Sequence, residues 1–203
     1  MVILVVALIA AVISFVVMGV FHEKRTRKIS AMAFARSARF SREDPFDIPQ
    51  RYRDFVLISC GHSPRAFNVT YGQVDFWTLR SFDFRYEVGH GTRRLSRLYS
   101  VVVIDTHLKL PDVMMWNDSD SDNAPLEIMQ IDGHIGRWSF AGDAKFAAKL
   151  CDFAQKDGFE NLSLQIYNNT LLLSRAAGAK SAENDTINPD IAVDLLRELK
   201  DNF

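Results

Sequence analysis

The chain has 203 residues, 48% of them hydrophobic and 24% charged, which excludes an intrinsically disordered chain. Beyond its apolar start, about 180 residues remain, which fits one domain rather than two. The formal net charge of -1 is unevenly distributed, because residues 22–53 hold nine Lys and Arg against four Asp and Glu. The remainder is acidic, which excludes nucleic acid as the expected partner, since its binding needs a contiguous basic face on the folded part.

The chain begins with an uncharged apolar run of 20 residues, Val2–Phe21. As a helix, such a run is about 30 Å long and matches the hydrocarbon thickness of a bilayer. A cleaved signal peptide would instead need a basic leading region, a shorter apolar stretch and a small-residue cleavage site, none of which is present. The sequence therefore predicts a transmembrane anchor at residues 1–23.

Four basic residues, Lys24, Arg25, Arg27 and Lys28, follow this run, and no basic side chain precedes Val2. The positive-inside rule then predicts a single-pass protein of the cell membrane with its C-terminal domain in the cytoplasm. The same four residues are predicted to contact the membrane surface, at about 1 kcal/mol each near anionic lipid. A role as a topology signal alone is an equal alternative.

Residues 24–50 are predicted to form a basic juxtamembrane stem. Apolar positions at helical spacing favour a helix from Lys24 to about Ala38, and Pro45 and Pro49 prevent it from continuing. A soluble domain is predicted at 51–203.

The first half of this domain is dense in strand patterns. Phe82, Phe84 and Tyr86 alternate with polar residues, which is typical of a strand with one buried and one solvated face. Gly89 and Gly91 tolerate positive φ and predict a hairpin turn before a strand at 98–104. The other predicted strands of this half are 55–59, 66–72, 74–80 and 81–88.

The second half combines short strands with helices. Asp143 is predicted to cap a helix that runs to Asp157 and ends at Gly158, and Asn188-Pro189 is predicted to open a last helix. Strands are predicted at 113–116, 126–131, 137–142, 162–167 and 170–174. Strands that come first and helices that come late, without strand-helix alternation, predict an α+β fold with a mostly antiparallel sheet.

An acidic loop carries Asp118, Asp120 and Asp122 at the spacing of a calcium loop. The sixth position of that loop is Asn123 instead of Gly, and Met129 stands where a bidentate Glu is needed. The pattern therefore favours a solvated turn, and no metal site is predicted.

The histidines lack the short spacing of a metal site, and no catalytic or cofactor-binding residue is predicted. His62, His90 and His134 stay candidates for catalysis only if the fold brings them to a carboxylate. The two cysteines, Cys60 and Cys151, are predicted to be buried free thiols, with a disulfide bridge as an alternative.

Arg93, Arg94 and Arg97 follow the glycine turn. Guanidinium groups close to a tight turn could hold a phosphate or carboxylate, but the pattern favours an ordinary solvated strand face.

Two motifs carry a family resemblance. They are F-x-L-x-x-x-G-H-S-x-R-x-x-N-V-x-Y-G from Phe55 to Gly72 and F-D-x-R-Y-x-x-G-x-G from Phe82 to Gly91. With the preceding apolar segment and basic stem, the chain resembles a family of uncharacterised bacterial single-span membrane-anchored proteins. The resemblance implies the topology and the fold, and it implies no activity.

Three functions remain open from the sequence. The leading hypothesis is a membrane-tethered cytoplasmic domain that binds a protein or lipid-headgroup partner without catalysis and without a cofactor. One alternative is a membrane-anchored enzyme that uses the turn histidines. The other is an exported domain tethered to the outer face of the membrane.

Overall fold

The computed structural model describes residues 2–123, 130–155, 159, 161–177 and 185–202. Within its helices, the side chains at 2, 11, 12, 14, 15, 18, 121–123 and 202 lie outside the described set. In chain order the elements are α1 (Val2–Ala35), β1 (Arg39–Glu43), α2 (Ile48–Arg51), β2 (His62–Val74), β3 (Trp77–Val88), η1 (Gly91–Arg93), β4 (Leu95–Asp105), β5 (Val113–Asn117), η2 (Asp118–Asn123), β6 (Gly133–Ile135), β7 (Trp138–Gly142), α3 (Ala144–Ala154), β8 (Ser163–Tyr167), β9 (Thr170–Ala176) and α4 (Pro189–Asn202).

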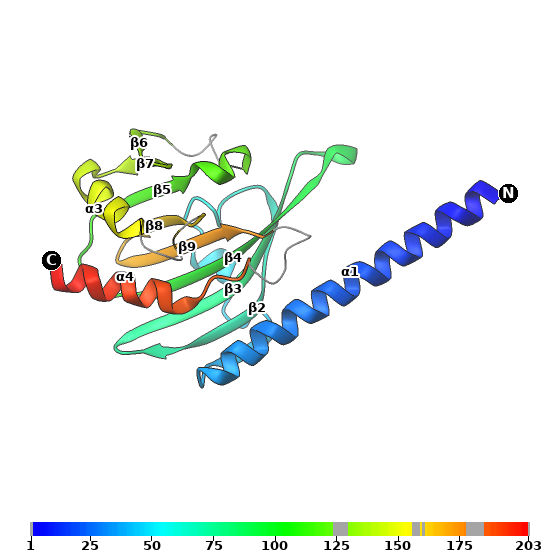
Figure 1. Ribbon diagram of the computed structural model, residues 1–203, viewed down its shortest axis with the longest axis horizontal. Coiled ribbons are helices and arrows are strands. Elements are labelled where there is room, and N and C mark those ends of the chain that lie inside the picture. The colour runs from blue at the N-terminus through cyan, green and yellow to red at the C-terminus, as the bar shows by residue number, and fades with distance from the viewer. Residues whose placement is uncertain (1, 124–129, 156–158, 160, 178–184, 203) are drawn as a thin grey trace.

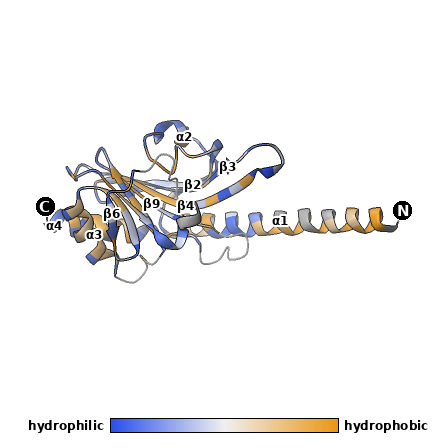
Figure 2. Ribbon diagram, turned by 90° about the horizontal axis from the view of Figure 1, so that it is seen from above, coloured by the Kyte–Doolittle hydropathy of each residue, from blue (hydrophilic) through white to orange (hydrophobic). Residues whose placement is uncertain are grey.

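Helix α1 is a single element of 34 residues. It runs without a break from the apolar segment into the predicted stem, because it contains no Pro, and its one Gly, Gly19, costs only about 1 kcal/mol within a helix. Its C-terminal half packs on the sheet through the buried side chains of Ile29 and Ala33, and its N-terminal half extends away from the body (Figures 1 and 2). In the described part of the chain, no helix meets both the length and the apolarity required to cross a bilayer.

The body is built on one sheet in which every neighbouring pair of the nine described strands is antiparallel. The strand order is β1-β2-β3-β4-β9-β8-β5-β7-β6, so β1 and β6 form the two edges (Figure 1). Helices α3 and α4 come late in the chain, after seven and nine of the strands respectively. The prediction of an α+β domain with a mostly antiparallel sheet is therefore confirmed.

Long hairpins form the half of the sheet closest to α1. Strands β3 and β4 pair from Thr78–Asp105 to Val88–Leu95, and the turn between them contains the predicted glycines, with Gly89 at φ 80° and Gly91 at φ 59°. The predicted hairpin is confirmed. The predicted division at residue 80 is wrong, because β3 continues through it as one strand.

Two segments depart from their predicted structure. Residues 55–59 form turns instead of a strand, and the side chains of Phe55, Leu57 and Ile58 all point into one core as a covering layer. In addition, β1 lies inside the predicted stem and pairs with β2. The stem is therefore part of the folded body, which corrects the predicted boundary at residue 50.

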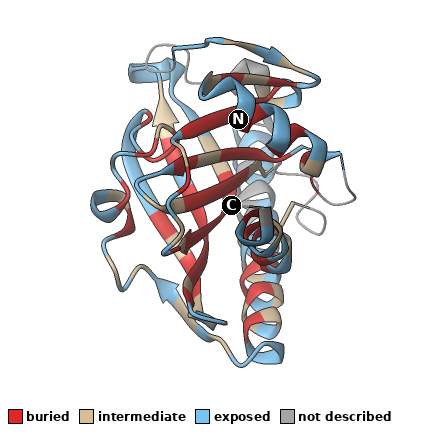
Figure 3. Ribbon diagram, turned by 90° about the vertical axis from the view of Figure 1, so that its left-hand side faces the viewer, coloured by how far each residue is buried: buried red, intermediate tan, exposed pale blue. Residues whose placement is uncertain are grey.

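Both faces of the sheet are covered. Val102 and Ile104 of β4 face the core beneath α3 and α4, whereas Val101 and Val103 face the core beneath residues 48–60. Figure 3 shows the buried strands between these layers. A continuous apolar run in a central strand follows from this double burial. The predicted solvated face of β3 is wrong at Asp83, whose side chain is buried beneath α1.

The late helices agree with their predicted starts. The carboxylate of Asp143 accepts a hydrogen bond from the backbone N–H of Phe146 at 2.8 Å, which caps α3, and α4 begins at Pro189. Helix α3 ends at Ala154, and the predicted stop at Gly158 lies outside the described residues, as do 126–129 of a predicted strand.

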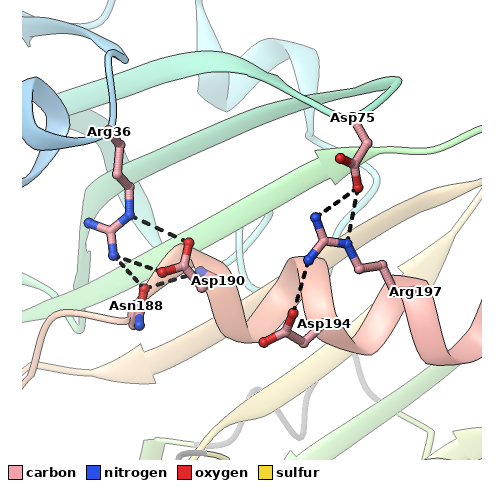
Figure 4. A network of polar contacts seen from close by, with 6 residues as sticks. All are labelled: Arg36, Asp75, Asn188, Asp190, Asp194 and Arg197. Atoms are coloured by element: carbon pink, nitrogen blue, oxygen red, sulfur yellow. Dashed lines mark hydrogen bonds and ion pairs between the residues drawn. The ribbon is translucent and has the colours of Figure 1, made fainter.

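Ion pairs attach α4 to the elements beside it (Figure 4). Arg36, just after α1, contacts Asp190 at 3.0 Å and Asn188 at 2.8 Å. Arg197 contacts Asp75 in the β2–β3 turn at 3.0 Å. These contacts join the end of α1, the first hairpin and α4 into one body.

Candidate binding groove

A buried ion pair fixes α1 on the sheet. The guanidinium of Arg25 donates to both carboxylate oxygens of Asp83 on β3, from Nε at 2.8 Å and from Nη2 at 2.6 Å. The two side chains are only 5% and 1% exposed. Burial alone would lower the pKa of Arg25, but the hydrogen bonds and the charge of Asp83 raise it above the ordinary arginine value. Arg25 therefore stays charged and holds one geometry.

Two neighbours complete this network. The amide nitrogen of Asn68 donates to Asp83 Oδ2 at 2.9 Å, and Thr26 Oγ1 donates to Asn68 Oδ1 at 3.0 Å. Asn68 sits at φ 52°, in the left-handed region, which Asn adopts more readily than most residues. Moving α1 off the sheet would separate this pair and leave Asp83 as an uncompensated buried charge, which is strongly unfavourable.

The structure therefore separates the four residues predicted to contact the membrane into buried, half-buried and exposed ones. Arg25 is buried against Asp83, so the prediction that it contacts a membrane surface is wrong for this residue. Lys24 and Arg27 are exposed, although Arg27 also pairs with Glu23 at 3.1 Å. Lys28 is half-buried and is not free of interactions.

A groove of about 1040 Å³ opens beside the middle of α1. Gly19, His22 and Thr26 form one wall, and β2 and β3 form another. Phe67 of β2 lies at the junction, with its ring 5.5 Å from that of His22 and the guanidinium of Arg85 5.7 Å above it. The groove thus begins where the apolar segment of α1 ends.

Two arginines face each other across strands β2 and β3 in this groove. Arg65 and Arg85 are directly paired in the antiparallel register, and both side chains are exposed. Like charges placed directly opposite on a sheet repel each other. Within the described residues, neither arginine has a carboxylate partner.

Carboxylates also line the groove, at the end of β1 and in the loop after it. They belong to Glu43, Asp44 and Asp47. Asp44 is engaged, because its carboxylate accepts from the backbone N–H of Phe46 at 2.9 Å and of Ile48 at 2.6 Å. The groove therefore presents guanidinium groups on β2 and β3, and carboxylates at the end of β1 and in the loop after it.

The structure brings together two of the three candidate histidines. The rings of His62 and His90 lie 4.9 Å apart at the β3–β4 turn, whereas His134 is on β6 at the far edge of the sheet, where it contacts Ser139. No cluster of three His, Cys, Asp or Glu side chains that could hold a metal occurs among the described residues. The three histidines do not form one site.

Carboxylates of the acidic loop accept hydrogen bonds from other side chains of the protein. Asp118 accepts a hydrogen bond from Ser139, and Asp120 accepts one from the buried Tyr99 hydroxyl at 2.8 Å. The side chain of Asp122 lies outside the described residues. These contacts agree with a structural turn.

Both cysteines are free and buried, as predicted. Cys60 is part of the segment 48–60 and packs into the core on that face of the sheet. Cys151 lies in the core on the other face. The alternative of a bridge between them is therefore wrong. Burial raises the pKa of the Cys60 thiol to about 12, which keeps it protonated and unreactive.

The arginines of the β3–β4 turn lie at the end of a projecting hairpin. Arg94 pairs with Glu87 at 3.2 Å, and Arg93 is exposed. In both views, this hairpin extends to the same side of the molecule as the N-terminal half of α1 (Figures 1 and 2).

No protein-family model matches the chain, and no curated protein sequence matches it. The chain is similar to the crystal structure of the mycobacterial trehalose monomycolate transport factor A, TtfA, with a TM-score of 0.54 and 16% sequence identity. The likeness covers 85% of this chain and 94% of the TtfA chain. At this level of identity, it shows a shared fold.

Proposed function

We propose that the chain is a single-pass, membrane-tethered cytoplasmic domain that binds a partner at its membrane-facing end and does not catalyse a reaction. The observation that carries this proposal is the two-part character of α1. Ile3, Leu4 and Leu8 are 86%, 74% and 63% exposed, whereas Arg25 and Ile29 are 5% exposed. Apolar side chains left in water cost about 25 cal/mol per Å², so the projecting half of α1 needs an apolar environment.

A bilayer supplies that environment for the whole segment. Residues Val2–Phe21 form about 30 Å of helix, the thickness of the hydrocarbon layer. The basic residues Lys24, Arg27 and Lys28 follow directly, which supports a cytoplasmic position for the body. A tethered domain needs its anchor and its body to be joined firmly, and the buried Arg25–Asp83 pair joins them.

The groove supports binding over catalysis. Guanidinium groups bind anions in fixed geometry but stay protonated at all ordinary pH values, so they serve recognition better than proton transfer. The groove also lies beside the last turn of the proposed anchor, where a lipid headgroup or a membrane-bound protein would be within reach.

Reporter fusions test the orientation. A phosphatase active only after export, fused after Phe203, should be silent, and a fluorescent protein that matures in the cytoplasm should be bright at the same position. Replacing Lys24, Arg27 and Lys28 by Gln and adding three lysines after Met1 should reverse both signals. An active phosphatase on the unchanged chain would favour the exported alternative instead.

The fold likeness suggests a second candidate role. The protein of similar fold is a trehalose monomycolate transport factor, and this chain has a groove beside its proposed anchor. The second candidate is therefore that this protein assists the transport of a lipid at the membrane. Cells that lack the protein should then show an altered composition of surface-exposed lipids by mass spectrometry, and an unchanged composition would contradict this role.

A further inference from the structure

The facing arginines in the groove have no structural role that explains them. Arg65 and Arg85 are direct neighbours across β2 and β3, both exposed, and within the described residues their charges have no carboxylate partner. The stacking of Arg85 on Phe67 orients one guanidinium and leaves its charge unpaired. Two like charges held side by side favour an anion between them.

A phosphate fits this arrangement chemically. Side chains paired across antiparallel strands have Cβ atoms about 5 Å apart, so two guanidinium groups can reach the oxygens of one phosphate. Guanidinium groups donate two parallel hydrogen bonds to phosphate oxygens, which are short and strong because both partners are charged.

The position of the groove indicates where the phosphate comes from. With Val2–Phe21 in the hydrocarbon layer, the next five residues rise about 7 Å, which is the depth of the headgroup layer. His22 and Thr26 fall within these five residues and line the groove. Arg65 and Arg85, on the opposite wall, therefore face the headgroups.

We propose that Arg65 and Arg85 together bind the phosphate of a phospholipid headgroup in the groove beside α1. This inference rests on the proposed membrane tether and names the partner of that function. Glu43 at the end of β1 and Asp47 in the loop after it disfavour a second anionic group, so the site takes a headgroup whose remaining part is neutral or cationic.

Native mass spectrometry of the full-length chain in detergent tests the proposal. Short-chain phosphatidylethanolamine is titrated against the unchanged protein, the double variant R65Q/R85Q and the matched control R39Q/R53Q, which removes two exposed arginines outside the groove lining. Loss of the charged hydrogen bonds should weaken lipid binding by about tenfold or more in R65Q/R85Q and by less than about twofold in the control.

Two further arms separate the sources of phosphate and the causes of loss. The variant R65K/R85K keeps the charge and loses the paired donors, so it should bind with intermediate affinity. The melting temperature of R65Q/R85Q should change little, because loss of the Arg85–Phe67 stacking is offset by removal of a like-charge contact, so lost binding will not reflect unfolding. Inorganic phosphate should compete weakly, since it lacks the acyl chains that hold the headgroup at the groove.

Equal lipid affinity in R65Q/R85Q and R39Q/R53Q would overturn the proposal, and so would inorganic phosphate that binds as tightly as the lipid. Either result would leave the tether intact. Failure of the tether appears separately, as a full-length chain that does not remain with membranes.

Discussion

At the residue scale, the pair of Arg25 and Asp83 determines how the proposed anchor meets the body. The sequence shows the basic residues after the apolar segment, but it does not show which of them are buried and which are exposed. Arg25 is separated from Asp83 by 58 residues, and only the fold shows that this arginine is buried while Lys24 is exposed. The spacing of residues along a basic run cannot identify which of them pairs with a carboxylate on a strand that is distant in the sequence.

Removing Asp83 should leave a buried, unpaired guanidinium. We expect Asp83→Ala to lower the free energy of unfolding by about 3–5 kcal/mol, while the double substitution R25M/D83L costs less because no charge stays unpaired. Urea denaturation of the full chain in detergent, followed by tryptophan fluorescence, measures both. As a control, Asp190→Ala removes the exposed partner of Arg36 and should cost within about 1 kcal/mol. A cost for Asp83→Ala no larger than that of the control would contradict the role of this pair.

The two turn glycines should differ in their tolerance of a side chain. A Cβ added at Gly89 would lie 2.6 Å from the carbonyl oxygen of Arg93, whereas one added at Gly91 meets nothing within 4 Å. Both positions carry the left-handed penalty of about 1 kcal/mol, so Gly89→Ala should destabilise the body clearly more than Gly91→Ala. The same urea denaturation compares the two variants. An equal loss would mean that the turn relaxes around the added methyl group.

At the element scale, the sequence predicts strands that show clear alternation of apolar and polar residues or a recognisable turn. It does not predict the apolar segments that pack over a face of the sheet. The turns at Gly89–Gly91 and Asn168–Asn169 identify their hairpins because these residues tolerate positive φ. Residues 55–59 are as apolar as a strand, yet they cover the sheet from outside. Short apolar runs do not distinguish these two outcomes, because burial alone makes both apolar.

The candidate site depends on a register that the sequence does not reveal. From the β2–β3 turn, Thr70 pairs with Ser81, and an irregularity that contains Asn68 then shifts the pairing so that Arg65 meets Arg85. Without this shift, Arg65 would lie on the other face, because a slip of one residue exchanges the faces of a strand. Asn68 was the available signal, since Asn tolerates the left-handed conformation.

The β3–β4 hairpin should reach the headgroup layer. It projects to the same side as the apolar half of α1, and membrane helices tilt by about 20° on average, which can bring such a projection to the bilayer surface. Because Cys60 and Cys151 are buried, a dye attached to Thr92→Cys labels the tip selectively. In lipid nanodiscs, headgroup-level quenchers should quench this dye and should leave the same dye at Phe76→Cys, in the turn at the opposite end of β3, unquenched.

Equal quenching at the two positions, or quenching at Phe76→Cys alone, would contradict the proposed placement of the body on the membrane. A result of that kind would also remove Arg65 and Arg85 from headgroup depth. The depth measurement is therefore independent of lipid affinity and tests the geometry behind it.

At the scale of the whole molecule, one continuous helix joins an apolar projection to a sheet covered on both faces. The cationic residues that follow the projection and the groove beside it lie at the same level of α1. The structural similarity to TtfA extends over most of both chains, and it concerns the fold. The proposed chemistry of the groove rests on the residues of this chain alone. Anchor, orientation and binding site are three parts of one proposal, and the anchor is the part on which the other two depend.

Extraction of native membranes with alkaline carbonate tests the anchor most directly. Burial of Val2–Phe21 in hydrocarbon does not depend on charge, so the full-length protein should remain in the membrane pellet after carbonate and after high salt. A variant that lacks residues 2–21 should appear in the supernatant in folded form. Release of the full-length protein by carbonate, or retention of the shortened variant in the pellet, would contradict the account.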